Sequence, residues 1–121
     1  MKSMKSKKRT IGDFGEEIAL KYLEKKGYQI LDRNFLKPYG EIDIIAIKND
    51  ILTFVEVKTR KNDEFKPASL DVDYYKQERI KKTAQAYIME KDLGEFLISF
   101  DVCEVYLENK TIHYIKNAFG D

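Results

Sequence analysis

Cysteine and histidine are nearly absent from this sequence of 121 residues, which has one of each. Because Cys103 is the only cysteine, an intramolecular disulfide and a cysteine-based zinc site are excluded. Because His113 is the only histidine, mechanisms that need a histidine pair and histidine-rich metal sites are excluded as well. This composition suits a reducing cytoplasm, and it leaves any catalysis to other side chains.

Long hydrophobic runs are missing too. No stretch approaches the roughly 18 consecutive apolar residues of a membrane span, and no apolar segment follows the basic start as in a signal peptide. We therefore expect a soluble, cytoplasmic protein with no membrane partner. A chain of this length buries roughly two-thirds of its unfolded surface, which is enough for one core. We expect a basic, flexible arm over residues 1–9 and a single domain over residues 10–121.

Charge is balanced overall but uneven along the chain. The net charge is +1, from 22 Lys and Arg against 21 Asp and Glu. The first ten residues carry five basic side chains and no acidic one, so the rest is mildly acidic. Such an arm would contact phosphates by releasing counterions, and it would equally well keep the start of the chain solvated. The arm alone therefore identifies no partner.

Hydrophobic periodicity predicts two helices. Residues 10–26 begin with a capping box at Thr10 and continue with apolar residues at helical spacing, and Gly27 supplies a stop. A second helix is predicted to begin after its cap, Asp73, and to end before Gly94.

Segments rich in β-branched and aromatic residues predict five strands. These segments are residues 28–35, 41–48, 51–59, 96–107 and 111–115. Asn49 and Asp50 predict a tight hairpin between the second and third strands. The polar stretch 60–69 contains Pro67 and is expected to be a loop. The order αβββαββ predicts an α/β domain with a mixed central sheet flanked by helices.

Acidic residues interrupt both strands of this hairpin. Glu41 and Asp43 share one face of the first strand, and Glu56 and Lys58 share one face of the second. A two-residue turn would place Asp43 opposite Glu56, and two acids at that separation repel each other. The same register would place Glu41 opposite Lys58, whereas a three-residue turn would break both pairings.

A divalent cation would compensate this repulsion. Mg²⁺ prefers oxygen and is commonly held by one or two carboxylates together with waters and phosphate oxygens. Lys58 would then orient a water or stabilise negative charge on a phosphate in the transition state. The pattern thus indicates a Mg²⁺ or Mn²⁺ site suited to phosphodiester hydrolysis. The alternative is an exposed pair of Glu41 with Lys58, with Asp43 and Glu56 at a solvated strand end.

An acid in one strand followed, across a hairpin, by Glu-x-Lys resembles the PD-(D/E)xK signature of nucleases with the restriction-endonuclease-like fold. Asp43 is the first acid, Glu56 to Lys58 form the second half, and Ile42 stands where the signature has proline. Longer stretches are similar to the YraN-like family of small bacterial proteins, whose layout is similar to that of archaeal Holliday junction resolvases. These stretches are GEEIALKYLEKKGY at 15–28, RNF at 33–35, GEIDIIA at 40–46, FVEVKTR at 54–60 and NAF at 117–119.

The resemblance implies a role for each acid. It implies that Asp43 and Glu56 are ligands of Mg²⁺ or Mn²⁺, with the carbonyl of Val57 as a further ligand. Lys58 would orient or activate the attacking water. Glu16 matches a helix acid that approaches the metal directly or through water, and its alternative is a first-turn acid favoured by the helix dipole.

Basic residues and one further acid complete the candidate set. Lys76 matches a basic or amide position that often faces the active site in this superfamily. Arg60 and Lys61 follow the catalytic strand and would hold phosphates. For these three residues the alternative is a solvated charge. Asp101 either organises the site or makes a structural hydrogen bond, and Cys103 is expected to be a small core residue.

The function that the resemblance implies is that of a Mg²⁺-dependent endonuclease acting on DNA, with branched or junction DNA as a candidate substrate. Cleavage would leave a 5′-phosphate and a 3′-hydroxyl. Because junction resolvases act as symmetric dimers, a homodimer is a further hypothesis. The rival interpretation is a nucleic-acid-binding module of a DNA- or RNA-processing assembly that has no nuclease activity of its own.

Overall fold

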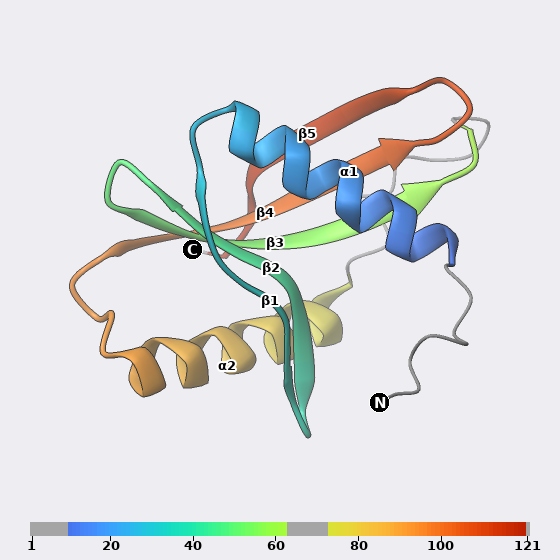
Figure 1. The fold of residues 1–121 in the computed structure, drawn as a ribbon. Coiled ribbons are helices and arrows are strands. Elements are labelled where there is room, and N and C mark those ends of the chain that lie inside the picture. The colour runs from blue at the N-terminus through green and yellow to red at the C-terminus, as the bar shows by residue number, and fades with distance from the viewer. Residues whose placement is uncertain (1–9, 63–72, 121) are drawn as a thin grey trace, which may run out of the picture.

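A five-stranded sheet in the order β1-β2-β3-β4-β5 forms the centre of the structure (Figure 1). The computed structural model describes residues 10–62 and 73–120. Its elements are α1 (Ile11–Lys25), β1 (Gln29–Lys37), β2 (Gly40–Lys48), β3 (Ile51–Arg60), α2 (Tyr74–Lys91), β4 (Leu97–Tyr106) and β5 (Thr111–Phe119). The predicted order and the α/β class are thereby confirmed. The predicted basic arm, residues 1–9, and residues 63–69 of the predicted loop lie outside the described residues.

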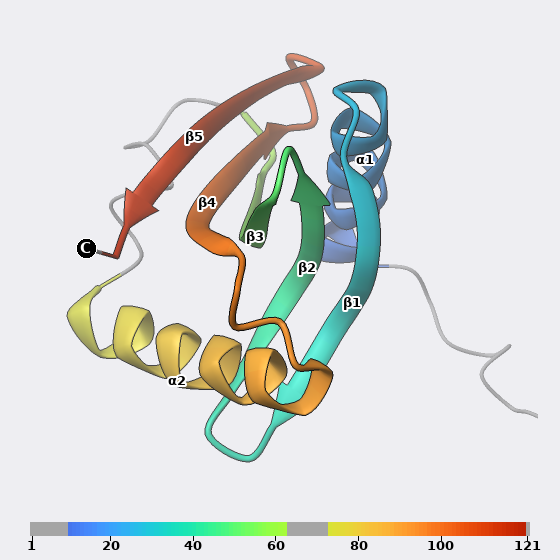
Figure 2. The same ribbon diagram turned by 90° about the vertical axis from the view of Figure 1, so that its left-hand side faces the viewer.

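The sheet is mixed, as predicted. Only β3 and β4 run parallel, and the other neighbouring strands run antiparallel. Figure 2 shows the strands side by side from β5 to β1. The segment between β3 and β4 contains α2, which gives the chain the length that a parallel connection needs.

Both helices begin where the sequence predicts, and α2 ends at Lys91, before Gly94 as predicted. At the start of α1, Thr10 and Asp13 exchange two hydrogen bonds of 3.0 Å, each from a backbone N–H to the other side chain. Gly27 follows α1 with a φ of 94°, which glycine adopts at little cost. At the end of α2 the left-handed residue is Asp92, with a φ of 56°, and not Gly94. None of the described helices is long and apolar enough to cross a membrane.

The two helices cover opposite faces of the sheet (Figure 1). Two consecutive residues of β3 show the two faces: Phe54 belongs to the core cluster that contains Tyr87 of α2, and Val55 belongs to the cluster that contains Leu23 of α1. Cys103 is fully buried in the cluster beneath α1, so the prediction of a core cysteine is confirmed.

The predicted hairpin forms between β2 and β3. Asn49 and Asp50 are its two turn residues, and their φ values of 52° and 64° are those of a tight hairpin turn. The cross-strand register runs as predicted from this turn to the pair of Ile44 with Val55.

Beyond that pair β2 separates from β3. The predicted cross-strand pairs of Asp43 with Glu56 and of Glu41 with Lys58 are therefore wrong, because the β2–β3 ladder has already ended. β2 remains paired with β1 as far as Gly40, and this hairpin bends towards α2 (Figure 1).

A close approach at Gly40 holds the end of the β1–β2 hairpin on α2. A Cβ atom at this position would lie 2.5 Å from Thr83 Oγ1 and 3.0 Å from the carbonyl oxygen of Arg79. Only glycine leaves room for α2 at this distance. The contact keeps the hairpin on α2 and away from the second half of β3, and the space between the strands becomes the candidate site.

Candidate active site

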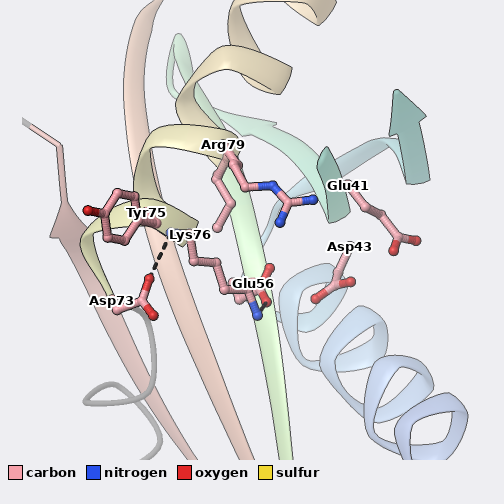
Figure 3. A pocket seen from close by; sticks show the side chains of 8 residues that line it. Glu41, Asp43, Glu56, Asp73, Tyr75, Lys76 and Arg79 are labelled. Carbon is pink, nitrogen blue, oxygen red and sulfur yellow. Dashed lines mark hydrogen bonds and ion pairs between the residues drawn. The ribbon is translucent and has the colours of Figure 1, made fainter. Parts of the chain in front are cut away.

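The separation of β2 from β3 opens two hollows that share Glu41 and Asp43. The first has a volume of about 500 Å³ and lies between the strands and the start of α2. Figure 3 shows Lys76 from α2 and Glu56 from β3 directed into it. The second has a volume of about 530 Å³ and lies between the strands and the start of α1. Its lining includes the predicted residues Glu16, Val57 and Lys58.

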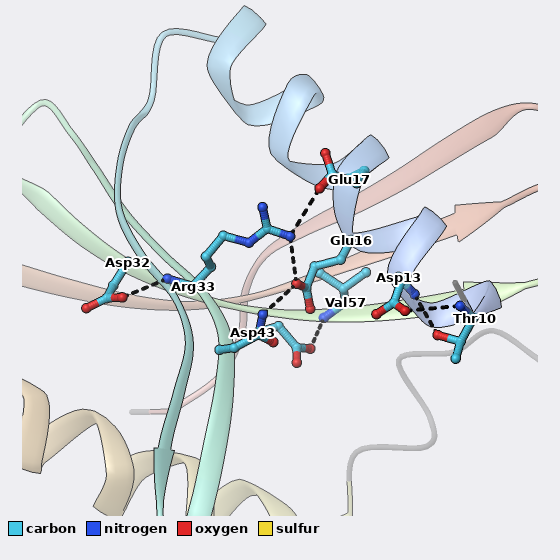
Figure 4. A network of polar contacts seen from close by, with 9 residues as sticks. Thr10, Asp13, Glu16, Glu17, Asp32, Arg33, Asp43 and Val57 are labelled. Atoms are coloured by element: carbon cyan, nitrogen blue, oxygen red, sulfur yellow. Dashed lines mark hydrogen bonds and ion pairs between the residues drawn. The ribbon is translucent and has the colours of Figure 1, made fainter. Parts of the chain in front are cut away.

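Asp43 bridges the gap where the strands part. Its Oδ2 accepts a hydrogen bond of 2.8 Å from the backbone N–H of Val57, the donor that a continued ladder would otherwise use (Figure 4). Burial raises the pKa of Asp43 to about 7; the negative charge of Glu56 also raises it, and the bond from Val57 opposes both. The site therefore disfavours the charged carboxylate, and a bound cation would favour it.

Glu56 is a nearly buried carboxylate between two lysines. Its Oε2 lies 2.8 Å from Lys76 Nζ and 3.6 Å from Lys58 Nζ, and the residue is 9% exposed. Burial lowers the pKa of Lys58, and the neighbouring Lys76 lowers it further. Burial also acts to lower the pKa of Lys76, but the hydrogen bonds of that lysine, first that to Glu56, outweigh it and raise the pKa. Of the two lysines, Lys58 is thus the one that releases its proton more readily.

Glu16 is held beside Asp43 by residues of β1. Its Oε1 accepts a hydrogen bond of 3.2 Å from Arg33 Nη2 (Figure 4) and one of 2.9 Å from Asn34 Nδ2. Arg33 also contacts Glu17 at 3.3 Å. Glu16 lies beyond the first turn of α1, so the alternative of a first-turn acid is wrong. Its charge contributes to the raised pKa of Asp43.

Gly15 lets α1 approach β3 closely enough to place Glu16 there. A Cβ atom on Gly15 would lie 1.8 Å from Thr59 Oγ1 and 2.8 Å from Thr59 Cβ. The helix backbone therefore rests directly on the second half of β3. The neighbouring Glu16 consequently shares a hollow with Val57 and Lys58.

Arg60 and Lys61 lie farther along the chain than the clustered residues. Neither is among the residues that line the two hollows. Arg60 is the last residue of β3, which extends one residue beyond its predicted end, because the Arg60 carbonyl accepts a hydrogen bond from the N–H of Leu107 at 2.9 Å. The Lys61 carbonyl accepts from Glu108 at 2.8 Å. The structure thus brings together the predicted acids, Val57, Lys58 and Lys76, and leaves the phosphate role of Arg60 and Lys61 a prediction.

Sequence reasoning missed three polar residues of the site. Arg79 lines the first hollow, and its Nε donates a hydrogen bond of 2.9 Å to the carbonyl of Tyr39. The spacing of three residues between Lys76 and Arg79, which puts both on one helix face, was the available signal. Arg33 and Asn34 occur in the RNF stretch, but nothing in the sequence indicated that they hold Glu16.

The donors at the site fit a Mg²⁺ ion held by few protein ligands. Among residues 10–62 and 73–120, no three His, Cys, Asp or Glu side chains come together as a ligand set. Asp43 and Glu56 line the same hollow and offer hard oxygen atoms, and their mutual repulsion is what a cation would relieve. Mg²⁺ commonly takes one or two carboxylates and fills its remaining positions with water and phosphate oxygens.

The fold and the site define a small α/β protein with a carboxylate and lysine cluster where two strands of a mixed sheet part. The chain belongs to the uncharacterised protein family UPF0102, whose sequence profile matches residues 15–105. This match confirms the expected YraN-like family. The matched span includes every residue of the candidate cluster.

Relatives in three bacteria cover nearly the whole chain. A UPF0102 protein of Caldanaerobacter subterraneus is 44% identical over 120 residues, which are 95% of this chain and 98% of the relative. A UPF0102 protein of Alkaliphilus oremlandii is 47% identical over 113 residues, 90% of this chain and 97% of the relative. A UPF0102 protein of Clostridium beijerinckii is 47% identical over 120 residues, 96% of this chain and 98% of the relative.

Proposed function

We propose that this protein is a Mg²⁺-dependent endonuclease that hydrolyses phosphodiester bonds in DNA. The observation that carries the proposal is the gathering of Asp43, Glu56 and Lys58 where β2 leaves β3. The sequence places one acid before a hairpin and Glu-x-Lys after it, as in PD-(D/E)xK nucleases. A mixed sheet with a helix on each face is compatible with the restriction-endonuclease-like fold of those enzymes.

Two carboxylates would bind the metal ion, and one lysine would act on the attacking water. Asp43 and Glu56 would hold the cation, with the carbonyl of Val57 and the carboxylate of Glu16 as further direct or water-mediated contacts. When bound, Mg²⁺ would neutralise charge on the phosphate oxygens and lower the pKa of a water. Lys58, whose own pKa is lowered by burial, is suited to orient the attacking water and take part in its deprotonation.

The bond changes follow from in-line attack of water on phosphorus. The oxygen of the water becomes part of a 5′-phosphate, and the bond between phosphorus and the 3′ oxygen breaks. The leaving oxygen takes up a proton and becomes a 3′-hydroxyl. Lys76 would hold a phosphate beside the reacting group, and Arg60 and Lys61 would contact phosphates farther along the strand.

Branched or junction DNA is the substrate class that we propose, on the likeness to archaeal junction resolvases. One chain offers one site, so symmetric cutting of two strands would require a homodimer. Sedimentation velocity with and without a four-way junction tests this point. A monomer in both states would contradict the dimer.

A cleavage assay on a panel of substrates tests the proposed activity. Labelled linear, flap and four-way-junction DNA, with a matched RNA, would be incubated with the parent protein in Mg²⁺ or Mn²⁺. The test variants are Glu56→Ala and Lys58→Ala, and the control is Lys21→Ala, which changes an exposed lysine on α1.

We expect the parent and the control to cut DNA, and the two test variants to cut at least about a hundredfold more slowly. Equal cutting by all proteins would reveal a contaminant and refute the assignment. DNA binding without cutting by the parent would favour the binding-module interpretation.

A further inference from the structure

A second polar region lies at the opposite end of the sheet from the candidate active site. Ile51 and Thr53, at the start of β3, line this region, whereas Glu56 and Lys58 lie in the second half of the strand. Figure 1 shows the end of α1 and the β2–β3 turn towards one end of the sheet and the start of α1 towards the other. The two regions are therefore separate.

Two adjoining hollows make up this region. Their volumes are about 140 and 160 Å³, and they share Tyr28, Lys48 and Lys116. One extends across the sheet to Asp101, and the other extends to Lys26 at the end of α1. Both are smaller than the roughly 300–1,000 Å³ of pockets that enclose drug-sized ligands. They suit a group such as a phosphate better than a whole cofactor.

Three lysines gather here, and no acid among the described residues pairs with them. Within residues 10–62 and 73–120, no carboxylate forms an ion pair with Lys26, Lys48 or Lys116. By contrast, Lys37 and Lys76 each pair with a glutamate. Asp101 lines only the hollow of about 140 Å³, whereas the hollow of about 160 Å³ is lined by all three lysines and by no carboxylate. Three like charges around this hollow create a positive potential that attracts an anion.

Aromatic rings and a carbonyl fix two of these lysines. Lys48 Nζ donates a hydrogen bond to the carbonyl of Lys26 and lies 5.3 Å from the ring centroid of Tyr28. Lys26 Nζ lies 5.5 Å from the ring centroid of Tyr22. Side chains that are already ordered lose less freedom when a ligand binds, so Lys26 and Lys48 are preorganised.

Asp101 lies buried at the base of this region. It is 1% exposed, and it accepts hydrogen bonds from the hydroxyls of Ser99 and Tyr114, both at 2.6 Å, and from the N–H of Asn117 at 2.9 Å. Of the two roles expected for Asp101, these contacts support the structural hydrogen bond. Through Tyr114, which stacks on Tyr22 at a centroid distance of 5.6 Å, Asp101 also fixes the aromatic wall.

We propose that Lys26, Lys48 and Lys116 form a second anchoring site that binds phosphate groups of a nucleic acid. Lysine ammonium groups act as point charges for phosphate, and the three line one hollow. The identity of the anion as a nucleic-acid phosphate rests on the proposed function. Glu16 at the carboxylate site and Lys26 at the anchoring site are ten residues apart along α1 and its C-cap, a helical rise of about 15 Å. At about 3.4 Å per phosphate, one strand would cross this distance in about four to five nucleotides.

The test is DNA binding in EDTA, so that no cleavage occurs. Binding of fluorescein-labelled duplex DNA to the parent would be followed by anisotropy over a series of salt concentrations. The test protein carries Lys26→Gln, Lys48→Gln and Lys116→Gln. The control protein carries Lys21→Gln, Lys91→Gln and Lys110→Gln, which alter exposed lysines outside both hollows. Thermal unfolding of each protein checks that the fold is kept.

Each phosphate contact contributes about 0.9 to the slope of log Kobs against log salt concentration. We expect the magnitude of this slope to be smaller by about 2 to 3 in the test protein than in the parent, and we expect the control to keep the parent value. An unchanged slope, or an equal loss in the control, would overturn the proposal. Amide shifts at the anchoring site in inorganic phosphate, with an unchanged DNA slope, would assign the site to small anions and also overturn it.

The experiments distinguish failure of the anchoring site from failure of the proposed nuclease activity. Loss of slope in the test protein, with no cutting by the parent in Mg²⁺, would support the anchoring site and refute the nuclease. Cutting that depends on Glu56, with an unchanged slope, would support the nuclease and refute the anchoring site.

Discussion

Replacing Asp43 by asparagine should stabilise the protein at neutral pH while removing a proposed metal ligand. Burial, together with the charge of Glu56, raises the pKa of Asp43 from 3.8 to about 7. The folded protein therefore keeps a proton on this carboxyl that the unfolded chain has already released. Stability must fall as the pH rises from about 4 to about 7, because in this range the folded state binds more protons than the unfolded state.

The pKa shift sets the size of the effect. Each pKa unit corresponds to about 1.4 kcal/mol, so ionisation of Asp43 costs up to about 4 kcal/mol of stability at pH 8. The side chain of asparagine cannot ionise, and its oxygen can still accept the hydrogen bond from the N–H of Val57. Asp43→Asn should therefore match the parent near pH 4 and exceed its unfolding free energy by up to about 4 kcal/mol at pH 8.

Urea unfolding followed by circular dichroism at pH 4, 6 and 8 measures this difference. The slope of unfolding free energy against urea should be the same for both proteins, so that midpoints report stability. Asp50→Asn, in the exposed turn between β2 and β3, is the matched control and should follow the parent at every pH. Parallel stability curves for Asp43→Asn and the parent would refute the reasoning.

Three further changes test the packing and the charges of the site. Gly15→Ala should destabilise the fold by at least about 2 kcal/mol in urea unfolding, because its Cβ would lie 1.8 Å from Thr59 Oγ1. Adding Thr59→Gly to the same chain should restore much of the lost stability. An unchanged unfolding free energy in Gly15→Ala would contradict this close approach. Lys76→Gln should tighten Mn²⁺ binding on the order of tenfold by calorimetry, since it removes the ammonium 2.8 Å from Glu56 Oε2, and weaker binding would refute this expectation. Thr10→Ala should cost about 1 kcal/mol in urea unfolding through loss of the capping box, and an unchanged midpoint would show that the cap does not contribute.

The sequence predicts local features of this fold well. Asn49 and Asp50 specify their turn because both tolerate positive φ, and the turn then determines the register up to Ile44 with Val55. Each strand also pairs with its neighbour in sequence, which keeps the strand order simple.

The site depends on contacts between distant segments, which the sequence does not reveal. The parting of β2 from β3 follows from the contact of Gly40 with Thr83, two residues more than forty positions apart. Asp43 lies where the strands part, but its hydrogen-bond partner across the gap is the N–H of Val57, and it does not pair with Glu56 across the ladder. The restraint of Glu16 by Asn34 likewise appears only when α1 lies against β1.

Binding of a divalent cation tests the central claim most directly, because it does not depend on which nucleic acid is supplied. Electron paramagnetic resonance of added Mn²⁺ would count the ions bound by the parent, Asp43→Asn, Glu56→Gln and the control Asp50→Asn. We predict one bound Mn²⁺ per chain in the parent and the control, with a loss of at least about tenfold in affinity in Asp43→Asn and in Glu56→Gln. Equal binding by all four proteins, or no binding by the parent, would contradict a metal-dependent nuclease at this site.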